Sequence, residues 1–186
     1  MKTRLFITFL FASVIFYTAN AQETQTEKEY EIGASVKYWM AGDIYFIDDV
    51  EKEGGVVLNA YADYNIVPKF AVGAYFNYGP NFSVEESEES GKFSEIGMQL
   101  KVRILAGSIK ICPALQIGYR SIKVEDIKEL KTDGFGVNMN LDIVIPTKGK
   151  LAIVPSIGFL SQPVGGNDIG DVTWAPIMFL GVGIAF

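Results

Sequence analysis

Eight charged residues recur on one face of successive chain segments in which polar and apolar side chains alternate. They carry both signs of charge: Lys37, Asp63, Glu95, Lys101, Arg103, Lys110, Arg120 and Asp142. Asparagine and glutamine side chains and glycines lie between them on the same face. Charges that are enclosed together must pair, because an isolated charge removed from water is strongly disfavoured. We expect these residues to form two stacked layers of ion pairs inside a closed structure.

Other chemistry is excluded by what the chain lacks. It contains no histidine, which general-base catalysis most often uses, and the single cysteine, Cys112, excludes an internal disulfide. Metal sites built on histidine and cysteine are excluded for the same reason. The formal charge of −6, without a basic patch along the sequence, argues against nucleic-acid binding. We therefore expect no catalytic residue, no metal and no cofactor.

The elements that position the charged residues are strands, because the dominant sequence period is two. Each predicted strand has 10 to 14 residues, and about 9–11 tilted residues are enough to cross a bilayer. The predicted strands cover 29–40, 55–66, 69–78, 93–105, 108–121, 134–145, 151–161 and 173–186.

The second face of each strand carries no charge. In the segment 93–105, for example, this face presents Ile96, Met98 and Leu100. A charge on the lipid-facing side of a membrane barrel costs about 2–4 kcal/mol near the midplane, so that side must be uncharged. The backbone must also close on itself, because an open sheet edge would leave unpaired groups in hydrocarbon. The predicted fold class is all-β, an eight-stranded antiparallel up-and-down transmembrane β-barrel.

The connections between strands alternate strictly between short and long. The short ones are Val67-Pro68, Ala106-Gly107 and 146–150, and the turn at Ala106-Gly107 would set Arg103 opposite Lys110. The long ones are 41–54, 79–92, 122–133 and 162–172, and the first two are rich in Asp and Glu. Outer-membrane barrels have short periplasmic turns and longer external loops. We expect acidic external loops and both chain ends in the periplasm.

The first 21 residues have the pattern of a secretory signal peptide. Lys2 and Arg4 precede an apolar run from Leu5 to Tyr17, and Ala19-Asn20-Ala21 offers a small-x-small cleavage site. Removal of Lys2 and Arg4 changes the formal charge from −6 to −8. The predicted organisation is a signal peptide at 1–21, a short periplasmic segment at 22–28 and a barrel domain at 29–186.

Three prolines fall inside predicted strands. Pro113, Pro155 and Pro176 cannot donate a ladder hydrogen bond, so each is expected at a bulge or bend. The strand register is least defined at these positions.

The last strand carries the clearest resemblance to known proteins. Its outward positions end in an aromatic residue: Leu180, Val182, Ile184 and Phe186. With the eight strands and the signal peptide, the chain resembles the small bacterial outer-membrane β-barrel families, namely the OmpA transmembrane domain, OmpX-like proteins and related outer membrane protein β-barrel domains. The resemblance implies the outer membrane of a Gram-negative bacterium, contact with lipid and lipopolysaccharide, and recognition of the four residues by the barrel-assembly machinery.

Three functions remain open at this point. The leading one is a monomeric structural or interaction protein that acts through its loops and whose lumen is plugged by ion pairs. The second is a narrow porin, or a channel for small solutes or hydrophobic molecules. The third is a soluble periplasmic lipocalin-like barrel, in which the apolar face would point inward.

Overall fold

The computed structural model describes residues 30–40, 42–45, 51–84, 90–124, 131–160, 173–174 and 177–186, with side chains for 30–40, 54–80, 91–123, 133–160 and 177–186. The predicted signal peptide (1–21), the periplasmic segment (22–28) and the loop 162–172 lie outside these ranges. The strands are β1 Tyr30–Trp39, β2 Gly42–Tyr45, β3 Glu51–Val67, β4 Phe70–Val84, β5 Ser90–Val102, β6 Ile104–Ala106, β7 Ile109–Val124, β8 Lys131–Pro146, β9 Ala152–Leu160, β10 Thr173–Trp174 and β11 Ile177–Ala185.

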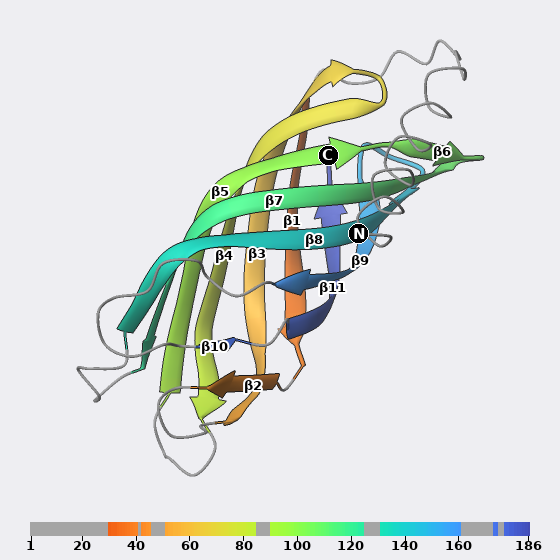
Figure 1. Ribbon diagram of the computed structural model, residues 1–186. Helices are drawn as coiled ribbons and strands as arrows, with labels where there is room; N and C mark the ends of the chain where they lie inside the picture. Colours follow the sequence, from red (N-terminus) through yellow and green to blue (C-terminus); the bar gives the residue numbers. More distant parts are fainter. Residues whose placement is uncertain are drawn as a thin grey trace, which may run out of the picture.

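Eight of these strands close into a barrel (Figure 1). The order around the wall is β1, β3, β4, β5, β7, β8, β9 and β11, and β11 pairs with β1. Each neighbouring pair is antiparallel. The prediction of an eight-stranded antiparallel up-and-down barrel is confirmed.

The remaining strands are short. β2 pairs with β3 and with β10, and β6 continues the course of β5 along β7. The break between β5 and β6 falls at Arg103, whose backbone N–H donates to Lys69 O at 2.9 Å. Among the described residues there is no helix long and apolar enough to span a membrane.

The three short connections define one end of the barrel, here called the turn end; the opposite end is the loop end. Ala106 pairs with Ile109, so the tight turn is Gly107-Ser108, with Gly107 at φ 66°. The turn therefore lies one residue later than expected. Lys110 consequently lies opposite Leu105, and the predicted pairing of Arg103 with Lys110 is wrong. Glycine suits this position, since a positive φ is costly for residues with a Cβ.

At the loop end the strands extend into segments that the sequence assigns to loops. β4 runs to Val84, β5 begins at Ser90, β7 runs to Val124 and β8 begins at Lys131. Alternating apolar residues identify only the part of a strand whose outer face must be uncharged. Beyond that part the backbone pairing between strands continues, but the sequence no longer alternates between polar and apolar residues.

The prolines produce gaps in pairing but no shift of register. Opposite Pro113, pairing with β7 passes from Lys101 on β5 to Ile104 on β6. On β8, pairing with β9 skips the residue opposite Pro155. The irregularities in register occur elsewhere, along β3–β4 and β4–β5, so of the expected bulge or bend no bulge is present at Pro113 or Pro155. Pro176 lies outside the described residues.

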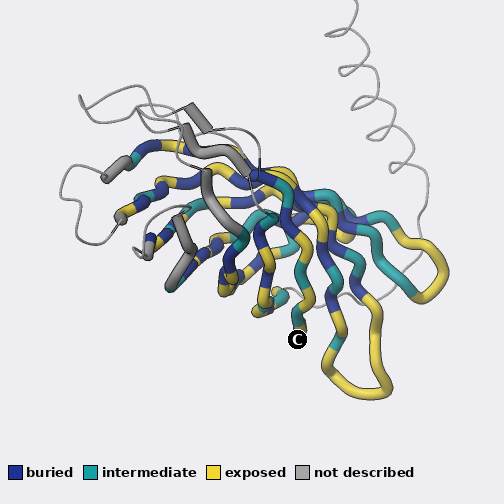
Figure 2. The backbone as a smooth tube through the Cα atoms, turned by 90° about the horizontal axis from the view of Figure 1, so that it is seen from below, coloured by how far each residue is buried: buried dark blue, intermediate teal, exposed yellow. Residues whose placement is uncertain are grey.

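Buried and more exposed residues alternate along the strands of the barrel wall (Figure 2). On β5, Glu95 and Gln99 are 1% and 4% exposed, whereas Ile96 and Met98 are both 65% exposed. The charged face is therefore inside and the apolar face outside. This arrangement is the reverse of a lipocalin-like barrel, so the soluble alternative does not fit the structure.

Candidate functional site

The interior of the barrel holds an ion pair toward the loop end. Glu95 and Arg120 are direct neighbours on β5 and β7, and one guanidinium nitrogen of Arg120 lies 2.8 Å from Glu95 Oε1. Both side chains are fully buried. Glu95 also accepts hydrogen bonds from the Tyr75 hydroxyl at 3.1 Å and from the amides of Asn77 and Asn138, each at 3.0 Å. This group is called the loop-end ion pair.

A second group, the turn-end ion cluster, comprises Glu31, Asp63, Lys101, Arg103 and Asp142. Its centre is Lys101 Nζ, which lies 2.6 Å from Asp63, 3.6 Å from Glu31 and 3.7 Å from Asp142. Arg103 lies 3.3 Å from Glu31. Because three carboxylates surround it, Lys101 is held by opposite charge on several sides.

Arg103 also donates a hydrogen bond to Asn65, and Glu31 accepts one from the Tyr61 hydroxyl at 3.2 Å. The prediction overlooked Glu31, although it shares the odd-numbered face of its strand with Lys37. The alternation of the strand could therefore have identified Glu31 as an inward residue.

Amide side chains join the two charged groups. Asn138 donates to Gln116 at 3.3 Å, Gln116 donates to Gln99 at 2.7 Å, and Gln99 donates to Asp63 at 2.5 Å. The chain extends on the other side from Asn77 through Asn59 to Ser35. A continuous polar network therefore crosses the lumen from wall to wall.

The buried charges are balanced. Four buried cations, Lys37, Lys101, Arg103 and Arg120, face three buried carboxylates, Asp63, Glu95 and Asp142, and the carboxylate of Glu31, whose side chain is 12% exposed. A low-dielectric interior tolerates charges only when they are compensated. The described interior meets this condition.

The other two predicted residues are Lys37 and Lys110. Lys37 is buried, with its Nζ 4.5 Å from the Phe179 ring centroid, and no carboxylate of the described residues lies within ion-pair distance. Lys110 is half-buried near the turn end, opposite Leu105 and Val144.

An apolar layer, which the sequence reasoning missed, fills the lumen toward the loop end. Its members are inward-facing and nearly completely buried: Trp39, Val57, Phe93, Ile122, Leu160, Ile177 and Phe179. The rings of Trp39 and Phe93 meet edge to face with centroids 4.5 Å apart. The layer separates the polar network from the loop end.

A smaller apolar cluster packs against the turn-end ion cluster. It contains Tyr61, Tyr75, Cys112, Val144, Val154 and Ala185. Lys101 Nζ lies 4.0 Å from the Tyr61 ring centroid, so this cation is held by an aromatic face as well as by carboxylates. Cys112 is a buried free thiol within the cluster.

A small cavity remains in the middle of the lumen. Its volume is about 10 Å³, and its lining includes Lys37, Asp142, Asn140 and Ser156. Asn140 Oδ1 and Ser156 Oγ have no hydrogen-bond partner among the described residues. A space of this size holds about one water molecule.

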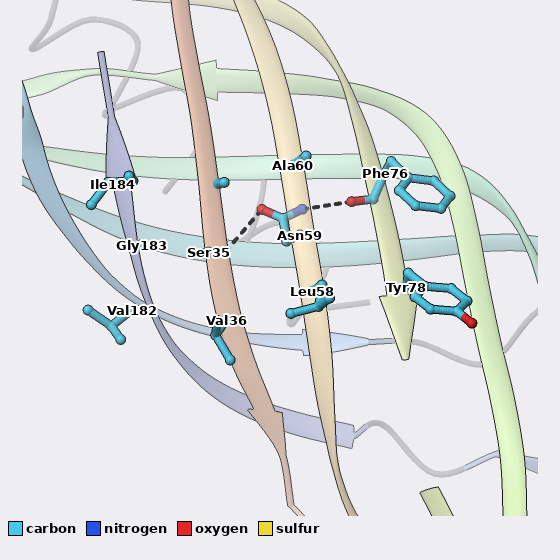
Figure 3. A pocket seen from close by; sticks show the side chains of 11 residues that line it. Ser35, Val36, Leu58, Asn59, Ala60, Phe76, Tyr78, Val182, Gly183 and Ile184 are labelled. Atoms are coloured by element: carbon cyan, nitrogen blue, oxygen red, sulfur yellow. Dashed lines mark hydrogen bonds between the residues drawn. The ribbon is translucent and has the colours of Figure 1, made fainter. Parts of the chain in front are cut away.

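A wider groove of about 630 Å³ lies on the outer face of β11, β1, β3 and β4 (Figure 3). Its lining combines the small residues Ala34 and Ala60 with larger side chains such as Phe76, Tyr78 and Val182. Groove and lumen cavity share Ala34, Ser35, Asn59 and Gly183 in their linings. Only one layer of the wall separates them there.

The last strand presents its four predicted residues outward. The exposed fractions of Leu180, Val182, Ile184 and Phe186 lie between 45% and 57%. Phe186 donates its backbone N–H to Ile32 O at 2.9 Å, which continues the β1–β11 ladder to the chain end.

Among the described residues, no group of three or more His, Cys, Asp or Glu is placed to hold a metal ion.

Comparison with family models and with the sequences of curated proteins gave no match. Solved structures, by contrast, share the fold. Neisserial surface protein A matches with a TM-score of 0.66 at 9% identity, over 85% of this chain and 96% of that chain. The N-terminal β-barrel domain of Pseudomonas aeruginosa OprF matches with 0.54 at 9% identity, over 84% and 96%. Ail, the attachment invasion locus protein of Yersinia pestis, matches with 0.54 at 15% identity, over 86% and 100%. The chain has the fold of the small eight-stranded outer-membrane β-barrels.

Proposed function

We propose that this chain is an integral β-barrel of a bacterial outer membrane, with a structural or interaction role through its loop end and a closed lumen. The observation that carries the proposal is the inverted barrel: uncharged side chains cover the outside between the two ends of the barrel, while four cations and four carboxylates are enclosed. Such a surface suits acyl chains and is unsuited to water. The shared fold with outer-membrane proteins supports the same location.

Site-directed labelling tests the orientation. Leu100→Cys and Gln99→Cys place a thiol on adjacent positions, one 43% and the other 4% exposed. In a Cys112→Ala background, a bilayer-soluble thiol reagent is expected to modify position 100 and leave position 99 unmodified. Modification of position 99 alone would contradict the proposal, as would extraction of the protein without detergent.

Three features together support a closed lumen: the polar network, the apolar layer and a central cavity with room for about one water molecule. The refolded protein is therefore expected to give no steady conductance in planar bilayers. Discrete channel openings recorded with the wild-type protein would favour a porin instead. A catalytic role is not proposed, because the chain has no histidine and its buried polar groups are mostly engaged with one another.

A second candidate function is a lateral path for small hydrophobic molecules. One observation favours it: the outer groove and the lumen cavity share Ser35, Asn59 and Gly183 in their linings. Gly183→Val would fill the space between groove and cavity. Because its Cβ would press on Ser35 and Ala34 of the neighbouring strand, heat-modifiable gel mobility first establishes that the variant is folded. Uptake of an apolar dye into proteoliposomes should fall in this variant if the path exists. Equal uptake by wild type, Gly183→Val and protein-free vesicles would eliminate it.

A further inference from the structure

Four inward side chains from β1, β8 and β9 meet at the central cavity of the lumen: Lys37, Asn140, Asp142 and Ser156. None of these residues is more than 9% exposed. Lys37, Ser156 and Asp142 belong to one row of cross-strand neighbours, in which Gly181 lies between Lys37 and Ser156. A Cβ at Gly181 would lie 2.7 Å from Ser156 Oγ and 2.8 Å from Lys37 Cγ. The glycine therefore allows the side chains of Lys37 and Ser156 to come together beside the cavity.

These groups have hydrogen-bonding capacity that the described residues do not use. Asn140 Oδ1 and Ser156 Oγ have no hydrogen-bond partner among the described residues. The cross-strand neighbours of Asn140 are Ala114 and Gly158, and neither offers a polar side chain. Lys37 has no described carboxylate within ion-pair distance and contacts an aromatic ring instead. Buried polar groups are nearly always hydrogen-bonded, so this set calls for a partner within the cavity.

The chemistry of the four groups fits a water molecule. The ammonium group of Lys37 only donates, the oxygens of Asp142 and Asn140 accept, and the hydroxyl of Ser156 can do both. Water donates and accepts, so a single molecule can meet both kinds of group. The cavity volume of about 10 Å³ is close to the space that one water molecule needs.

The enclosed charges disfavour an ion at the same place. The interior already holds four cations and four carboxylates. An added sodium or chloride ion would leave one charge without compensation in a low-dielectric interior. Lys37 would also repel a cation, and Asp142 would repel an anion. A neutral ligand avoids both costs.

We propose that one internal water molecule binds in this cavity and bridges the ammonium group of Lys37 to the carboxylate of Asp142, with Asn140 and Ser156 as its further ligands. Ser156 is the only polar side chain on β9 and β11, both of which are described over their full length. The water therefore extends the polar network to β9 and gives Lys37 an indirect ion-pair partner. The site goes beyond the proposed function and does not depend on it, because the barrel encloses these residues whatever surrounds its outer face.

A crystal structure of the wild-type protein tests the site, with crystals grown once from sodium chloride and once from sodium bromide. We expect one peak of electron density in both, about 2.7–3.2 Å from Lys37 Nζ and from an oxygen of Asp142, without anomalous signal from bromide. Anomalous signal at the peak would assign an anion. A peak that contacts oxygen atoms but not Lys37 would assign a cation, and a cavity without density would be dry. Each of these three results overturns the proposal.

Solution NMR of the refolded protein in detergent micelles adds a matched pair of variants. Ser156→Val removes the hydroxyl and places a methyl group at the cavity. Ser121→Val makes the same replacement on the outer face, since its chain neighbours Arg120 and Ile122 are buried inside. A nuclear Overhauser effect between water and the side-chain amide of Asn140 is expected in the wild type and in Ser121→Val, and its loss is expected in Ser156→Val.

Heat-modifiable gel mobility first establishes that both variants are folded. An Overhauser effect that is missing in the wild type, or that persists in a folded Ser156→Val protein, overturns the site. If Ser156→Val does not fold, the wild-type crystal structures decide the matter. Failure of the proposed function is distinguishable, because the Leu100→Cys and Gln99→Cys labels report membrane orientation independently of the water.

Discussion

The guanidinium of Arg120 and the carboxylate of Glu95 form a completely buried ion pair, 2.8 Å apart, between neighbouring strands. Three further donors, from Tyr75, Asn77 and Asn138, complete the hydrogen bonding of the carboxylate. With these donors, the pair joins four consecutive strands of the wall, β4, β5, β7 and β8. Its contribution should therefore appear in the free energy of unfolding of the barrel.

Glu95→Gln is expected to destabilise the barrel strongly, because it leaves the Arg120 charge without its ion-pair partner. Removal of one partner from a buried pair costs about 3–5 kcal/mol. The free energy of unfolding, measured by urea titration in detergent micelles, should fall by that order. The double variant Glu95→Gln/Arg120→Gln removes both charges and should recover part of the loss. A Glu95→Gln protein as stable as wild type would mean that the pair contributes nothing.

Trp39→Ala is expected to make the barrel conduct. The substitution removes the ring that packs on Phe93 and opens the apolar layer, which in a narrow pore acts as a hydrophobic constriction. Loss of a buried tryptophan also costs about 3–5 kcal/mol of stability. Single-channel recording of the refolded variant should show openings that the wild type lacks.

Tyr38→Ala is the matched control for Trp39→Ala. Tyr38 is the preceding residue on the same strand, but it faces outward and is 55% exposed. It should leave the conductance at the wild-type level. Equal conductance in both variants would show that the apolar layer does not close the lumen.

Alternation in the sequence predicts the closed eight-stranded wall and the inward face of Glu95, Lys101 and Asp142, because a lipid-facing surface excludes charge. It does not identify Trp39 or Phe93 as interior residues, since an apolar side chain is acceptable on either face. Asp63 and Asp142 were expected as the carboxylates for the cations of the turn end, but the individual contacts and the part played by Glu31 were not predicted. Lys101 contacts Glu31, Asp63 and Asp142, which come from three different strands, and only the closed wall brings these together.

The exact register between strands could not be predicted from the sequence either. The turn at Gly107-Ser108 differs from the expected turn by a single residue, and this is enough to place Lys110 opposite Leu105.

Gly97→Ala is expected to disrupt the wall, because a Cβ at Gly97 would meet the Ile117 carbonyl and the Gly118 Cα of the adjacent strand. Backbone atoms cannot move aside as a flexible side chain can. Heat-modifiable gel mobility should show a reduced folded fraction after refolding. Gly149→Ala is the control, since a Cβ there would have no atom within 4 Å. Equal folding of the two variants would argue against close backbone approach at Gly97.

Phe186→Ala is expected to impair assembly in cells while leaving refolding in detergent unchanged. The proposed role of the last strand is recognition by the assembly machinery, which detergent refolding bypasses. The side chain of Phe186 is 52% exposed, so its removal opens no core cavity, and the backbone bond from its N–H to Ile32 O is retained. Phe159→Ala is matched to it, being an outward aromatic that is 50% exposed on a different strand. The folded fraction in isolated outer membranes should fall for Phe186→Ala alone; a similar fall in both variants would identify Phe186 as an ordinary interfacial ring.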